Sequence, residues 1–112
     1  MIVRLFSDLH FDGGAYTITP QAHDVDAILV LAGDLSGFHR DLKFITVVTD
    51  QFKYVLFVAG NHEFYGADYF VVKKFWNEVD DDIDNFFFMD NRIKIIENVR
   101  FMGTTLWTDM DR

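Results

Sequence analysis

Five polar side chains with the chemistry of metal ligands or proton donors follow three short apolar runs of the chain. Asp8 and His10 follow the first run, Asp34 follows the second, and Asn61 and His62 follow the third. Carboxylate, imidazole and amide groups in combination bind hard to borderline divalent cations. Because the chain has no cysteine, oxygen and nitrogen atoms would hold such a cation in place of thiolates. The sequence therefore predicts a divalent metal site.

The three apolar runs, 2–7, 27–32 and 54–59, are predicted to be strands of a parallel sheet. Each run is short and rich in branched and aromatic residues, as expected for central strands that are covered on both faces. Apolar residues at helical spacing in 39–52 and 67–79 predict two crossover helices. This alternation of strands and helices predicts an α/β fold.

In open parallel sheets, ligands bind at the carboxyl ends of the strands. The five polar side chains all lie just beyond such ends, so we expect them to meet at one edge of the sheet. Asp8 and His10 are two residues apart, and on a continuing strand both would point to the same face. That spacing would let both side chains reach one ion.

The remaining part of the chain predicts shorter elements. The acidic run 80–82 is expected beyond the second helix, because carboxylates disfavour a helix C-terminus. Segments 86–88, 93–96 and 99–102 are predicted to be short strands, the last two forming a hairpin with Asn98 in its turn. The three phenylalanines at 86–88 are expected to lie in the core, or else to form an exposed apolar patch that a further segment would cover.

Length, composition and charge restrict the functional classes. The chain has 112 residues, half of them hydrophobic, which predicts one globular domain. A net charge of −8 excludes a broad binding surface for nucleic acid or anionic membrane. No apolar run approaches the roughly 18 residues of a membrane helix, and the chain does not open on a signal peptide. With no disulfides, this predicts a soluble, cytoplasmic protein.

The order of the three motifs is typical of a known family. D-x-H at 8–10, G-D-x-x-G at 33–37 and G-N-H-E at 60–63 follow the apolar runs at intervals of about two dozen residues. In this order they resemble the calcineurin-like metallophosphoesterases. The resemblance implies an α/β fold that is the N-terminal half of a metallophosphoesterase β-sandwich, with a mostly parallel sheet flanked by helices. It also implies that residues 1–112 form a single, partial domain of this family.

The resemblance also implies a role for each candidate residue. Asp8 and His10 would bind a first metal ion, Asp34 would bridge two ions, and Asn61 would bind the second. His62 would be the catalytic residue, acting near the phosphate as general acid. The cofactors would be two divalent cations (manganese, iron, zinc or magnesium). A hydroxide bridging them would attack the phosphorus of a phosphomonoester or phosphodiester substrate.

The sequence departs from the family pattern toward its C-terminal end. Family members complete the site with later histidines in Gly-His and Gly-His-x-His motifs, whereas no histidine follows His62 here. Alternatives to an active phosphoesterase are therefore a non-catalytic, truncated module that binds metal or protein, and half of a split enzyme. Self-association or a second chain would complete the latter. Asp12 and Glu63 are either groups that orient the histidines or solvated loop carboxylates.

Overall fold

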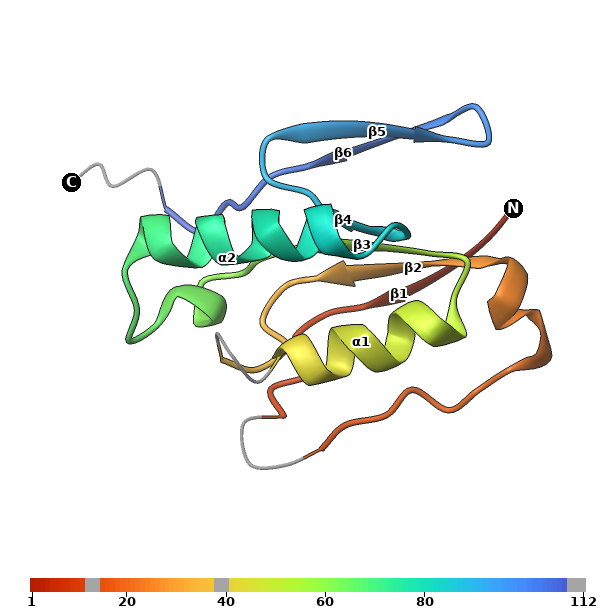
Figure 1. Ribbon diagram of the computed structural model, residues 1–112, viewed down its shortest axis with the longest axis horizontal. Helices are drawn as coiled ribbons and strands as arrows, with labels where there is room; N and C mark the ends of the chain where they lie inside the picture. Colours follow the sequence, from red (N-terminus) through yellow and green to blue (C-terminus); the bar gives the residue numbers. More distant parts are fainter. Residues whose placement is uncertain (12–14, 38–40, 109–112) are drawn as a thin grey trace.

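The computed structural model describes residues 1–11, 15–37 and 41–108. Strands and helices alternate along the chain in the predicted order (Figure 1). They are β1 (Ile2–Phe6), β2 (Ala27–Ala32), α1 (Asp41–Gln51), β3 (Tyr54–Val58), α2 (Tyr69–Asp82), β4 (Phe86–Phe88), β5 (Arg92–Ile96) and β6 (Val99–Gly103), with short 3-10 turns η1 (Ala22–Asp26) and η2 (His62–Phe64). The predicted helix start at His39 and the candidate residue Asp12 lie outside the described residues.

Four strands form a parallel sheet in the order β1-β2-β3-β4. Helices α1 and α2 pack on one face of this sheet, and the antiparallel hairpin β5–β6 lies over the other face (Figure 1). This arrangement confirms the predicted α/β fold with a mostly parallel sheet flanked by helices. It also places β2 and β3, which lead to Asp34 and to Asn61 and His62, side by side in the centre of the sheet.

The core on the helix side joins one face of each helix to alternate residues of the strands. In α1, Ile45 and Val48 are buried in this core. Phe86 and Phe88 of β4 are buried there too, which confirms the predicted core position of the phenylalanine run. Each such side chain stabilises the fold by about 1.5–3 kcal/mol. This layer therefore holds the strands that carry the polar motifs in fixed positions.

One face of β1 and one valine of α2, Val71, are exposed where the sequence predicted apolar packing. Strand β1 has a neighbour on one side only, and its Val3 and Leu5 are 45% and 66% exposed. The prediction that this strand is covered on both faces is wrong, because the hairpin packs on the neighbouring strands instead. In α2, Val71 is 54% exposed, since Val72 and Trp76 occupy the buried face of that helix.

Helix α2 is also longer than the sequence predicted. It continues to Asp82, so the acidic run 80–82 lies inside the helix and the prediction that it lies beyond is wrong. Asp80 accepts hydrogen bonds from the backbone N–H of Phe88, at 2.7 Å, and from the Arg92 guanidinium. These donors compensate a carboxylate that would otherwise disfavour the helix C-terminus.

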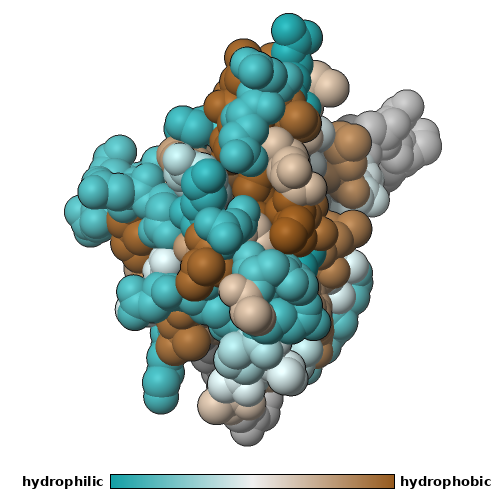
Figure 2. All heavy atoms as spheres, turned by 90° about the vertical axis from the view of Figure 1, so that its right-hand side faces the viewer, coloured by the Kyte–Doolittle hydropathy of each residue, from teal (hydrophilic) through white to brown (hydrophobic). Residues whose placement is uncertain are grey.

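The predicted hairpin of β5 and β6 is confirmed. Its turn residues Glu97 and Asn98 have φ values of 51° and 65°, as in the tight turns that suit hairpins. Ile96 and Phe101 face the sheet and pack with Ile28 in a second, smaller apolar cluster. Figure 2 shows apolar surface between the hairpin at the top and the rest of the molecule.

A buried carboxylate joins β1, η1 and α1 near the start of β2, away from the carboxyl ends of the strands. Asp24 is 2% exposed, and its Oδ1 lies 2.9 Å from Nη1 of Arg4. It also accepts hydrogen bonds from the Gln51 side chain at 2.6 Å and the Gln21 backbone at 2.9 Å. Burial alone would raise the pKa of Asp24, but these donors outweigh it and hold the pKa below its ordinary value of 3.8.

Candidate metal centre

The segments that follow β1 and β2 run side by side beyond the carboxyl ends of the strands. The Asp8 N–H donates to the Gly33 carbonyl at 3.0 Å, and the next such bond joins His10 N–H to the Asp34 carbonyl at 3.2 Å. Asp8, His10 and Asp34 have φ values of 55°, 50° and 55°, in the left-handed region that non-glycine residues rarely adopt. The prediction that Asp8 and His10 share one face of a continuing strand is therefore wrong, because β1 ends at Phe6.

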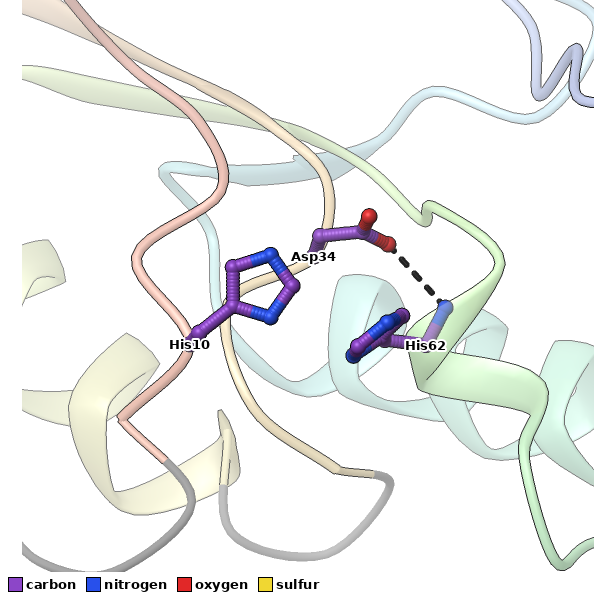
Figure 3. Close-up of side chains that lie close together, drawn as sticks. All are labelled: His10, Asp34 and His62. Atoms are coloured by element: carbon purple, nitrogen blue, oxygen red, sulfur yellow. Dashed lines mark hydrogen bonds between the residues drawn. The ribbon is translucent and has the colours of Figure 1, made fainter.

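Three of the predicted side chains gather at this edge of the sheet. His10, Asp34 and His62 follow β1, β2 and β3, and each offers a potential ligand atom within 4.8 Å of the other two (Figure 3). The backbone N–H of His62 donates to Asp34 Oδ1 at 3.0 Å. The two imidazole rings lie nearly perpendicular, with centroids 4.4 Å apart. The structure thus brings a carboxylate and two imidazoles together from three separate strands.

Asn61 and Asp8 lie beside this cluster. The Asn61 amide lies 3.1 and 3.2 Å from the two Asp34 carboxylate oxygens, and its other end contacts the Tyr65 hydroxyl. With its nitrogen toward Asp34, the amide donates to the carboxylate; with its oxygen toward Asp34, the facing oxygens suit a cation between them. Asp8 is further out, because its Oδ1 is 3.7 Å from His10 Nε2 and its side chain is 64% exposed.

Glu63 has a different role from the one that the sequence suggested. Its side chain is fully buried and accepts hydrogen bonds from the backbone N–H groups of Asp34 (2.7 Å), Leu35 (3.0 Å) and Gly60 (2.7 Å). These partners are main-chain amides at the ends of β2 and β3, in place of a histidine ring, and the burial of Glu63 shows that the solvated alternative is wrong. Burial raises the pKa of Glu63, as does the nearby Asp34 carboxylate, while the three N–H donors oppose that shift.

Two glycines allow these strand ends to approach each other closely. A Cβ on Gly60 would lie 2.1 Å from Asp34 Oδ1, and a Cβ on Gly33 would lie 2.7 Å from the Gly60 backbone nitrogen. Gly33 also has a φ of 86°, which side chains disfavour. The glycines that precede Asp34 and Asn61 in the motifs are therefore required by the close approach of the two loops.

The donor set fits a hard to borderline divalent cation. Two imidazoles, a carboxylate and an amide oxygen are ligands that magnesium, manganese, iron and zinc accept in proteins. The Asn61 amide lies 3.1 and 3.2 Å from the Asp34 carboxylate oxygens, so with its oxygen toward Asp34 it could share a cation with that carboxylate. Since no histidine follows His62, a second ion would find Asp34 and Asn61 as its predicted ligands.

Comparison with known proteins agrees with the motif order. Residues 1–108 match the sequence model of the family described as Calcineurin-like phosphoesterase. The chain is also similar to a protein of Acanthamoeba polyphaga mimivirus named Uncharacterized protein L509, with 24% identity over 132 residues. That similarity covers 97% of this chain and 45% of the viral protein, so the chain spans less than half of that relative's length. No solved structure gives a significant match.

Proposed function

Because this chain belongs to the calcineurin-like phosphoesterase family, we propose that it supplies the metal-binding half of a phosphoesterase that uses two divalent cations. The substrate is a phosphomonoester or phosphodiester. The observation that carries the proposal is the convergence of His10, Asp34 and His62 from three strand ends, with ligand atoms within 4.8 Å of one another. Turn formation alone would not explain why two imidazoles surround a carboxylate at this edge of the sheet.

In this proposal Asp8, His10, Asp34 and Asn61 hold the cations. Asp34 is the central ligand, because its carboxylate is in contact with the Asn61 amide and the His62 backbone. When bound, the cations would neutralise the charge of the phosphate and lower the pKa of water for attack on phosphorus. This local positive charge is needed in a chain whose net charge of −8 otherwise repels an anionic substrate.

We assign His62 the role of general acid. Its imidazole holds a proton at a ring nitrogen and transfers it to the oxygen that leaves phosphorus. The His62 ring packs against the rings of His10 and Tyr65, with centroids 4.4 and 4.8 Å away, and these contacts orient the side chain. The alternative is that His62 is itself a metal ligand, and the two roles predict different effects of its substitution.

The remaining ligands come from outside residues 1–112 in this proposal. The chain spans 45% of the viral relative and contains no histidine after His62, so a further polypeptide segment or a second copy would complete the site. A non-catalytic module that binds metal or protein is the competing function.

Among the described residues, no helix has the length and apolar character needed to cross a membrane. A cytoplasmic location stays a prediction that rests on the absence of cysteine.

Hydrolysis of bis-p-nitrophenyl phosphate in the presence of Mn²⁺ tests the proposed activity, with an Asp34→Asn variant as control. Any hydrolysis by the wild-type chain should be lost in the variant, because the variant loses the central carboxylate; such activity would mean that the half-site suffices or that self-association completes it. Hydrolysis at equal rates in both would contradict the assigned site. Binding of Mn²⁺ without hydrolysis above the variant would favour the non-catalytic module or a site that awaits its second half.

A further inference from the structure

Glu63 is a fully buried carboxylate that holds the main chain on which the candidate metal ligands are mounted. Its Oε1 accepts from the N–H groups of Asp34 and Gly60, both at 2.7 Å, and its Oε2 accepts from the N–H of Leu35 at 3.0 Å. An ionised carboxylate has acceptor sites only and satisfies all three donors. A glutamine of the same shape would direct an NH₂ group at one of them.

The pattern of these bonds fixes one residue in particular. The N–H groups of Asp34 and Leu35 belong to the two peptide planes that flank the Asp34 Cα, so holding both restricts φ and ψ of Asp34. That residue has a φ of 55°, a conformation that L-amino acids avoid without compensating contacts. The third bond, from Gly60, ties the end of β3 to the same carboxylate.

We propose that Glu63 is a positioning residue that fixes the left-handed backbone of Asp34 and thereby aims the Asp34 carboxylate at His10 and His62. Glu63 acts on the ligand side chains through the main chain, since its hydrogen bonds go to backbone amides. The consequence for metal binding rests on the proposed function. That Glu63 fixes the backbone of Asp34 does not rest on the proposed function, and it can be measured without a metal.

The carboxyl carbon of Asp34 reports the position of its carboxylate. Asp34 is 29 residues from Glu63 along the chain, and its Oδ1 accepts a hydrogen bond from the His62 N–H at 3.0 Å. In ¹³C spectra of the metal-free chain, Glu63→Gln should therefore shift the Asp34 carboxyl carbon, a nucleus that is not a sequence neighbour of the substituted residue. Val48→Ala is the matched control, because Val48 is a buried residue of α1 whose truncation lowers stability without touching this edge of the sheet.

Binding of Mn²⁺ tests the consequence at a temperature where circular dichroism shows both variants folded. We expect Glu63→Gln to weaken Mn²⁺ binding by about 10- to 100-fold, the usual effect of losing a group that orients ligands, and Val48→Ala to change it by less than about twofold. Should Glu63→Gln fail to fold, Glu63→Asp keeps a carboxylate but withdraws it from the amides, and it should shift the Asp34 carboxyl carbon as well.

An unshifted Asp34 carboxyl carbon in the Glu63 variants, together with Mn²⁺ affinity equal to that of Val48→Ala, would overturn the positioning role. A wild-type chain that binds no Mn²⁺ would instead refute the proposed function, and the shift of the Asp34 carboxyl carbon would still decide whether Glu63 positions Asp34.

Discussion

Replacing Gly60 by alanine puts a methyl group into the space that the Asp34 carboxylate occupies. The added Cβ would lie 2.1 Å from Asp34 Oδ1 and 2.8 Å from the Asp34 backbone nitrogen, whereas real Cβ atoms essentially never approach a heavy atom within 3.0 Å. The carboxylate must therefore move by at least 0.9 Å, the difference between 3.0 and 2.1 Å. The backbone contact prevents the side chain from relieving the clash alone.

A displacement of about 1 Å at a reacting or liganding group costs on the order of 10²-fold in rate, which corresponds to about 2.7 kcal/mol. The same movement breaks the 3.0 Å hydrogen bond between the His62 N–H and Asp34. We therefore expect Gly60→Ala to lower the Mn²⁺-dependent hydrolysis of bis-p-nitrophenyl phosphate about 100-fold. Calorimetric titration with Mn²⁺ should show affinity at least about tenfold weaker.

Gly37→Ala is the matched control within the same set of motifs. A Cβ at Gly37 would have nothing within 4 Å, so this variant should keep wild-type affinity and rate. Wild-type hydrolysis and Mn²⁺ affinity in Gly60→Ala would refute the reasoning, because they would mean that the Asp34 carboxylate is free to move without consequence. An equal loss in both variants would show that the effect is not specific to the clash.

Four further substitutions test the site and the fold. His62→Ala should lower hydrolysis by about 10²-fold or more with a small change in Mn²⁺ affinity if His62 is a general acid, whereas His10→Ala should mainly weaken Mn²⁺ binding; a large affinity loss in His62→Ala would make it a ligand. Asp24→Asn should cost about 1.5–3 kcal/mol of unfolding free energy at neutral pH, measured by urea titration, through lost charge-assisted hydrogen bonds. Because the folded pKa of Asp24 lies below 3.8, its ionised form stabilises the fold above that pH, and the contribution is lost as the pH falls through the folded pKa. The wild type should therefore lose stability more steeply than Asp24→Asn below pH 3.8, and parallel slopes would contradict the assignment. Ile45→Val, at a fully buried site of α1, should cost about 0.5–1.5 kcal/mol in the same titration without changing Mn²⁺ affinity.

The sequence predicted the sheet and the meeting of its polar residues because both follow from general rules. Apolar runs in alternation with helical patterns form parallel sheets, and the carboxyl ends of neighbouring parallel strands share an edge. Asp34 and His62 could be placed near each other for this reason, since β2 and β3 are adjacent. That no histidine follows His62 within residues 1–112 is also read directly from the sequence.

The remaining features depend on contacts that residue types do not specify. The left-handed conformation of Asp8 and His10 arises from the pairing of their segment with the one after β2, and the strand rule gave the wrong orientation. Exposure of β1 depends on where the hairpin packs, which its own pattern does not state. The run 80–82 stays helical because Arg92 compensates the charge of Asp80. Arg92 lies outside the helix, so a rule on carboxylates at helix ends does not take it into account.

Glu63 shows the same limit at the candidate site. The residue type allowed either a group that orients a histidine or a solvated loop carboxylate. Its three hydrogen bonds go to main-chain amides, and backbone donors have no signature in the sequence. A glycine before each of Asp34 and Asn61 is the signal that comes closest, since it marks two loops that must approach each other.

Paramagnetic broadening by Mn²⁺ tests the central claim, that three strand ends form one metal site. Trace Mn²⁺ added to the ¹⁵N-labelled chain should first broaden the amides of residues 8–10, 34–35 and 61–63, and the Asp34→Asn variant should lose this effect. Amides around Asp24, at the start of β2, should keep their intensity. Broadening that instead centres on the acidic run 80–82, or that is unchanged in Asp34→Asn, would contradict the site.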